Sequence, residues 1–199
     1  MKRNEFKTID IEGDGLAAQI NQKLFPEGNH FDPGTIIWCV TVCDQDYNTT
    51  TLVHKLPDKP RPVKDGYWTK AVHYASSKVP ESVDGHKVIE FTDMKDFLRE
   101  VCSAIYGSKV YCKAYVSGDK VYNYDRTVLD ANIDRYGCLG HTVTRNIEAV
   151  RVDNWKRTYN QVKPGQWIDN EQYMINGIRH NIEDAIQLAE KINRGEYET

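Results

Sequence analysis

Long hydrophobic runs are missing from this 199-residue sequence. A membrane-spanning helix needs about 18 to 20 consecutive apolar residues, and no stretch approaches that length. The polar start MKRNEFK leads directly into a strand-like segment. We therefore expect no signal peptide, no membrane anchor and a cytoplasmic protein.

Paired cysteines and an excess of positive charge are also missing. The five cysteines are an odd number and include no C-x-x-C pair, which argues against a disulfide framework and a zinc ribbon. Cys39 and Cys43 share one face of a strand-like run, so we expect them in the core. The formal net charge is −3. Any contact with nucleic acid must therefore be local or mediated by metal ions, because bulk positive charge is absent.

The hydrophobic pattern predicts one domain covering residues 1–199. Hydrophobic residues make up 40% of the chain, enough to bury a substantial core. Periodicity and turn residues predict strands at 6–12, 34–44, 49–56 and 109–116 and an extended segment at 141–152. They predict helices at 92–107 (N-cap Thr92, stop Gly107), 124–137 and 181–195. This order predicts an α/β fold, a mixed β-sheet flanked by helices.

The segment 57–87 combines prolines and charges and has no clean period. We expect a loop-rich insertion there, with at most one short helix. The short connection DQDYN before it predicts that strands 34–44 and 49–56 pair in antiparallel fashion. Loops as long as 57–87 usually border a binding site.

Two carboxylates stand at the end of the first predicted strand, in FKTIDIEGDGL. Asp10 and Glu12 alternate with Ile9 and Ile11, so both acids emerge on one side of the sheet, about 7 Å apart. Like charges at that distance are costly unless a cation lies between them or water surrounds them. Exposed acids at a strand end are an equal alternative from this stretch alone.

Two further acids stand on predicted helices. Asp125 opens the helix 124–137, where the helix dipole favours an acid, so capping alone would explain it. Asp184 lies beside the apolar stripe of the last helix, with His180 one turn earlier on the same side. A solvated helix edge is the alternative explanation for this pair.

Together these segments resemble the DEDD superfamily of 3′-to-5′ exonucleases. DIEGDGL looks like the first motif, D-x-E followed by a leucine in a loop, and the family's second and third strands come directly after it. NYDRTVL is similar to the second motif, although Asn123 stands one residue closer to Asp125 than usual. HNIEDAIQLAEKI is similar to the third and carries Asp184. The motifs occur in the family's order, span nearly the whole chain, and are nearest in character to the standalone phage exonucleases.

The resemblance implies a ribonuclease-H-like fold and a metal-dependent exonuclease that shortens single-stranded DNA or RNA from its 3′ end. Two Mg²⁺ or Mn²⁺ ions would be held by four carboxylates: Asp10, Glu12, Asp125 and Asp184. Hard oxygen ligands suit these ions and not zinc. The ions would activate the attacking water and stabilise the leaving oxygen. A phage enzyme of this kind would work in the host cytoplasm, and a homodimer stays open.

The third motif departs from the family in the position of its general base. A histidine stands five residues before the last aspartate in one subclass, and a tyrosine stands four before it in the other. Here His180 stands four before Asp184, and Arg179 stands five before it. A loop shortened by one residue where it enters the helix would bring His180 over the site. We favour this because a histidine of pKa about 6.5 accepts protons at neutral pH, and a displaced base with weak activity is the alternative.

The resemblance also implies contacts with the substrate strand. Leu16 would act as a wedge against the terminal base, and Gly15 would let the backbone approach the nucleotide. Candidate platforms for stacking and contacts for phosphates are Tyr67, Trp68, Tyr74, Tyr122 and Tyr124, and Lys113, Lys120, Arg126 and Arg179. Ordinary loop, core-edge or surface roles remain open for each of them.

Two other hypotheses compete with the exonuclease. A non-catalytic module could keep the ribonuclease-H-like fold and bind a nucleic-acid end or a partner protein, although such a module has no need for clustered like charges. An unrelated α/β domain would carry the acids as surface residues. It would place Asp10, Asp125 and Asp184 more than about 10 Å apart, too far to share a metal ion.

Overall fold

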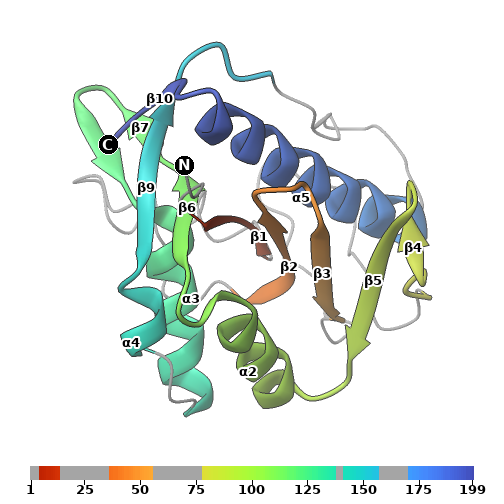
Figure 1. Cartoon of the computed structure of the whole chain (residues 1–199). Coiled ribbons are helices and arrows are strands. Elements are labelled where there is room, and N and C mark those ends of the chain that lie inside the picture. Colours follow the sequence, from red (N-terminus) through yellow and green to blue (C-terminus); the bar gives the residue numbers. More distant parts are fainter. Residues whose placement is uncertain (1–4, 14–35, 56–77, 138–140, 157–169) are drawn as a thin grey trace, which may run out of the picture.

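A mixed β-sheet forms the centre of the molecule in the computed structural model (Figure 1), which describes residues 5–13, 36–55, 78–137, 141–156 and 170–199. Its eight strands within these ranges are β1 (Phe6–Gly13), β2 (Ile37–Asp44), β3 (Thr49–His54), β4 (Ser82–Val83), β5 (His86–Phe91), β6 (Lys109–Lys113), β9 (Ile147–Val152) and β10 (Tyr197–Glu198). They lie in the order β10-β9-β6-β1-β2-β3-β5-β4. A separate hairpin consists of β7 (Tyr115–Ser117) and β8 (Lys120–Tyr122).

Strand β1 lies in the interior of this sheet and has neighbours of both kinds. It pairs with β2 in antiparallel fashion and with β6 in parallel fashion. Strand β2 pairs antiparallel with β3, and β6 pairs parallel with β9. The carboxyl ends of β1, β6 and β9 therefore point to the same edge of the sheet, and that edge carries the acids of β1.

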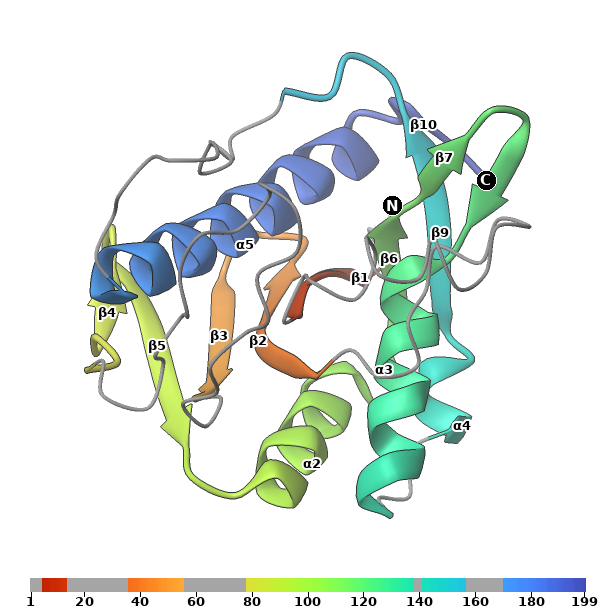
Figure 2. The same cartoon turned by 180° about the vertical axis from the view of Figure 1, so that it is seen from behind.

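Helices cover both faces of the sheet, as Figures 1 and 2 show from opposite sides. The helices are α2 (Met94–Ile105), α3 (Tyr124–Tyr136), the short α4 (His141–Thr144) and α5 (Asn170–Asn193). One core cluster packs α2 and α3 against Ile9 and Ile11 of β1. The apolar stripe of α5 packs on the opposite face, against Trp38 and Cys39 of β2.

Several predictions made from periodicity agree with the structure. The predicted strands 6–12, 34–44 and 49–56 correspond to β1, β2 and β3, with β2 and β3 antiparallel. Helices α2 and α3 match 92–107 and 124–137, and the glycines predicted to end them, Gly107 and Gly137, both have a positive φ. The α/β class is confirmed, and the predicted core cysteines of β2 are buried.

Other elements differ from the prediction. Helix α2 is capped by Asp93 and not by Thr92, because the Asp93 carboxylate accepts a hydrogen bond from the Asp96 amide at 3.0 Å. The segment 109–116 is divided between β6 and β7, and 141–152 begins with the turn of helix α4 before β9. Helix α5 starts eleven residues before the predicted position 181, and its early turns follow the same stripe through Met174 and Ile178.

The segment 57–87 was expected to be loop-rich. Residues 56–77 lie outside the described part of the chain, but 82–83 form β4 and 86–91 form β5. Strand β5 was missed because its partner in the sheet, β3, is more than thirty residues away, at Thr51↔Val88. Within the described ranges, no helix is both long enough and apolar enough to cross a membrane.

Candidate active site

The two acids of β1 lie on the face of the sheet that α5 covers. Ile9 and Ile11 belong to the core on the α2 and α3 side, so Asp10 and Glu12 point the opposite way, as the alternation of a strand requires. Thr8 shares the face of the acids, because its hydroxyl donates to the carbonyl of Ala185 in α5 at 2.7 Å. Two carboxylates thus stand under a helix where water has limited access.

Asp125 reaches the same region from the first turn of α3. Asn123 caps this helix: its Oδ1 accepts from the Arg126 amide at 3.1 Å, and its Nδ2 donates to the Ile147 carbonyl of β9 at 2.9 Å. The cap fixes the start of α3 against the sheet. As a result the Asp125 side chain is only 7% exposed, which is unusual for an acid that merely complements the helix dipole.

His180 and Asp184 stand one turn apart on α5 and contact each other. His180 Nε2 lies 3.2 Å from Asp184 Oδ2 and 3.4 Å from Glu12 Oε1. Asn181 holds this part of the helix to the sheet, because its Nδ2 donates to the Cys39 carbonyl at 3.1 Å. The histidine is therefore fixed above the acids of β1.

The explanation offered from the sequence for the unusual spacing is wrong. A shortened loop before the helix was expected to bring His180 over the site, but α5 begins at Asn170, ten residues before the histidine. His180 lies within the helix and reaches Asp184 by ordinary i, i+4 geometry. The spacing of four thus brings the imidazole to the acids without any change in a loop.

Apart from Glu12, which contacts His180 from outside the lining, these acids and His180 meet at one cavity of about 470 Å³. Asp10, Asp125, His180 and Asp184 line it, and ligand atoms of Asp10, His180 and Asp184 lie within 4.8 Å of one another. Residues from three distant parts of the sequence therefore meet at one edge of the sheet. An arrangement of independent surface acids would not bring them together.

Burial and mutual repulsion raise the pKa values of the acids. Burial first, then the charges of Asp184, Asp125 and Glu12, hold the pKa of Asp10 well above its usual range. Burial and the charges of Asp184 and Asp125 raise the pKa of Glu12 to about 8. The pKa of Asp125 is also raised to about 8, chiefly by burial and then by Asp184, while Lys113 acts in the opposite direction. This cluster retains protons at neutral pH unless another positive charge takes their place.

Burial lowers the pKa of His180 to about 4. Contact with carboxylates would ordinarily raise the pKa of an imidazole. Here burial is the dominant cause, and the pKa falls although Asp184 lies 3.2 Å away. His180 is therefore neutral at pH 7 and has a nitrogen that can accept a proton.

The residues present fit a hard divalent cation. Carboxylate oxygens are the donors that Mg²⁺ and Mn²⁺ prefer. Asp10 Oδ2 is buried and has no hydrogen-bond partner among the described residues, which is costly for a carboxylate oxygen without a cation. Of the four carboxylates predicted to hold the ions, Asp10 and Asp184 have ligand atoms within 4.8 Å of each other and of His180, and Asp125 lines the same cavity. Glu12 is connected to the group by its contact with His180.

Aromatic and basic side chains complete the wall of the cavity. Tyr124, named from the sequence as a stacking platform, lines it together with Lys113, Tyr115 and Trp155. Lys113 Nζ lies 5.3 Å from the centre of the Trp155 ring, so the ammonium is positioned by a cation–π contact. Sequence reasoning missed Trp155, although a tryptophan in the polar segment after β9 was a usable signal.

The remaining predicted substrate contacts lie elsewhere. Arg179 donates from Nε to Asp84 at 2.7 Å, outside the residues that line the acidic cavity, so a phosphate contact there would have to replace this ion pair. Leu16 and Gly15 lie outside the described residues, as do Tyr67, Trp68 and Tyr74. Arg126 lines a different cavity.

Comparison with known proteins adds no relative. No protein-family model matches the sequence, and a search of curated proteins finds no match. The function must therefore be inferred from the residues of the site itself.

Proposed function

We propose that the protein is a metal-dependent 3′-to-5′ exonuclease that removes nucleotides from single-stranded DNA or RNA. One observation carries this proposal: Asp10 of β1 and His180 and Asp184 of α5 place ligand atoms within 4.8 Å of one another, in a cavity that Asp125 of α3 also lines. Buried like charges in a group cost stability unless they serve a ligand, and a divalent cation is the ligand their chemistry suits.

The sheet supports a ribonuclease-H-like fold for this enzyme. Strands β2 and β3 come directly after the acids of β1, where the resemblance to the DEDD exonucleases places the second and third strands. They continue the sheet on one side of β1, and parallel strands β6 and β9 continue it on the other. Asp125 and Asp184 then come from helices that begin or pack beside these strands.

The chemistry that follows is hydrolysis of the last phosphodiester. Bound divalent cations would supply positive charge for the attacking water and for the leaving oxygen. His180 accepts the proton of the water as its oxygen attacks phosphorus, and the bond from phosphorus to the 3′ oxygen of the preceding nucleotide breaks. The 3′ oxygen takes a proton from solvent, and the terminal nucleotide leaves as a 5′-monophosphate. Lys113 offers a positive charge to the phosphate, and Tyr115, Tyr124 and Trp155 offer flat walls against which the terminal base can stack.

The test is hydrolysis of a 5′-labelled single-stranded DNA and of the matching RNA with Mg²⁺ or Mn²⁺. We expect a ladder of products shortened by single nucleotides, which disappears with chelator and in Asp184→Asn. Glu183→Gln is the matched control, because it removes a carboxylate from the neighbouring position of α5 that does not line the cavity. If a folded, metal-loaded protein shortens neither strand, the proposal fails, and a non-catalytic module that binds nucleic-acid ends takes its place.

A further inference from the structure

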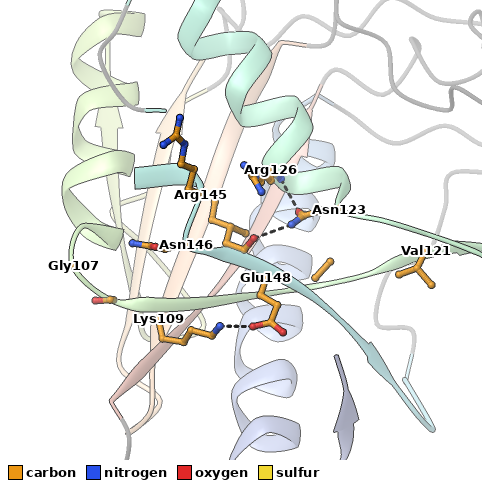
Figure 3. A pocket seen from close by; sticks show the side chains of 11 residues that line it. Gly107, Lys109, Val121, Asn123, Arg126, Arg145, Asn146 and Glu148 are labelled. Atoms are coloured by element: carbon orange, nitrogen blue, oxygen red, sulfur yellow. Dashed lines mark hydrogen bonds and ion pairs between the residues drawn. The ribbon is translucent and has the colours of Figure 1, made fainter. Parts of the chain in front are cut away.

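A second cavity, of about 730 Å³, lies beside the start of α3 (Figure 3). Its walls come from the turn between α2 and β6, the first turn of α3, strand β8 at Val121, the turn that leads into β9 and the first half of β9. Pockets that bind small ligands have volumes of about 300 to 1,000 Å³, so this one can hold a nucleotide.

Two arginines give this cavity a positive wall. Arg126 comes from α3 and Arg145 from the turn before β9, and Figure 3 shows both side chains on the same side of β9. Arg126 is only loosely paired, with Nε 3.8 Å from Asp130 Oδ2. Among the residues that the structure describes, no ion pair involves Arg145, which is exposed. Lys109 is occupied by its ion pair with Glu148.

The rest of the lining is apolar or able to form hydrogen bonds. Val121, which is 45% exposed, and the partly buried Ala149 supply apolar surface, whereas Ile147 is buried in the core. Asn146 is exposed at the rim beside Arg145. Guanidinium groups bind phosphate through paired hydrogen bonds, and the apolar side chains beside them can contact the sugar or base of the same nucleotide.

The first turn of α3 and the hairpin contribute side chains to both this cavity and the acidic cavity. Asp125 lines one and Arg126, the next residue, lines the other. The hairpin likewise contributes Tyr115 to the acidic cavity and Val121 to the second. A single strand whose 3′ end occupies the acidic cavity can therefore continue past the first turn of α3 into the second.

We propose that the second cavity binds a nucleotide of the substrate strand upstream of the one removed, with Arg126 and Arg145 on its phosphates. This inference rests on the proposed exonuclease function and specifies the path of its substrate. A chain of net charge −3 with an acidic cleavage site needs a local positive contact to hold a polyanion, and these arginines supply it.

The experiment compares strands of two lengths with wild type and the double variant Arg126→Gln/Arg145→Gln. Affinities are measured by fluorescence anisotropy with Mn²⁺, using an octanucleotide and a dinucleotide whose linkages resist hydrolysis. We expect the double variant to bind the octanucleotide about tenfold more weakly and the dinucleotide within about twofold of wild type. The slope of log affinity against log salt should fall by about 1 for the octanucleotide.

Arg99→Gln is the matched control, because this exposed arginine of α2 lines neither cavity. Equal loss for both lengths, or no loss for either, overturns the second site. A third outcome also contradicts the proposal: the double variant binds a 5′-mononucleotide more weakly but binds the octanucleotide as wild type does. The cavity would then be a site for a free nucleotide. Binding is measured without cleavage, so the two tests are independent. If no hydrolysis is found, the anisotropy measurement still decides whether the second cavity binds the strand. If hydrolysis is found but the double variant shows no length effect, the exonuclease proposal is kept and the second site is rejected.

Discussion

His180 lies four residues before Asp184 on a continuous helix, and side chains at this spacing lie one above the other. Its Nε2 is 3.2 Å from Asp184 and 3.4 Å from Glu12, and burial keeps the ring neutral at pH 7 by lowering its pKa to about 4. A neutral imidazole at this place can accept a proton without the five-residue spacing of the histidine subclass.

Replacing His180 should therefore affect catalysis and spare metal binding. We expect His180→Ala to lower kcat by about 10²- to 10⁴-fold, the usual contribution of a general base. The rise in Tm caused by Mn²⁺ should persist, because the four carboxylates remain. His180→Tyr should recover part of the activity, with its optimum at higher pH, since a phenol has a pKa of about 10. Activity of His180→Ala within about threefold of wild type would place the base elsewhere.

The raised pKa values of Glu12 and Asp125 predict how stability depends on pH and metal. Each acid has a pKa of about 8 in the folded protein and about 4 in the unfolded chain. In chelator, their contribution to stability is fully present below about pH 4 and is lost as pH rises through about 8. A bound cation removes the need for the protons, so the stabilisation it gives should grow with pH.

Thermal unfolding from pH 5.5 to 8.5, with Mn²⁺ and with chelator, measures this linkage. We expect the Mn²⁺-induced rise in Tm to be small at pH 5.5 and to reach about 5 °C or more at pH 8.5. Glu12→Gln should raise Tm in chelator at pH 8.5 and reduce the effect of Mn²⁺. If the Tm in chelator does not fall between pH 5.5 and 8.5, the pKa values of these acids are not raised in the folded protein.

At the scale of elements, α5 approaches the sheet closely at Gly177. A Cβ on this residue would lie 2.8 Å from two ring atoms of Trp38. The ring is buried, and its Nε1 donates to the Gly13 carbonyl at the end of β1, at 3.1 Å. The glycine thus sets the distance between α5, which carries His180, and the strand that carries Glu12.

Gly177→Ala should therefore destabilise the protein by about 1 to 3 kcal/mol, although alanine is normally the better helix residue by about 1 kcal/mol. Activity should fall as well, because a shift of α5 moves His180 away from Glu12. Urea unfolding and kcat measure the two effects, with Glu171→Ala in the exposed first turn of α5 as control. Trp38→Phe combined with Gly177→Ala should cost less than the sum of the two changes. Additive losses would show that Gly177 and Trp38 do not constrain each other.

The same helix shows how far the sequence could predict structure. The apolar stripe through Ile182 and Ala185 predicted the second half of α5. The first half contains Gly177, which does not indicate a helix, because a glycine is needed there only for the contact with Trp38 that the fold creates. The face of Asp10 followed from alternation alone. That Asp125 shares its cavity did not follow from periodicity and was implied only by the family resemblance, because the position of Asp125 depends on the link from Asn123 to Ile147 of β9. The second cavity could not be predicted either, because its walls come from segments that only the fold brings together.

At the scale of the whole molecule, side chains from helices on both faces of the sheet line the acidic cavity. Helix α3 packs with α2 on one face of the sheet, and α5 packs on the other. Asp125 and Asp184 bring these layers to the carboxyl end of β1, where like charges oppose their approach in the absence of a cation. A cation that contacts both acids would replace this repulsion with attraction and connect α3 to α5.

Hydrogen exchange tests this connection. Adding Mn²⁺ should slow amide exchange in the first turn of α3 and in the middle of α5 together, because local opening of either would break the shared site. In Asp125→Asn, protection of α5 should persist through Asp10 and Asp184, while the first turn of α3 should lose its response to Mn²⁺. Glu183→Gln should behave as wild type. If Mn²⁺ slows exchange only in α5 of the wild-type protein, the cation is held by β1 and α5 alone and Asp125 serves the start of its own helix.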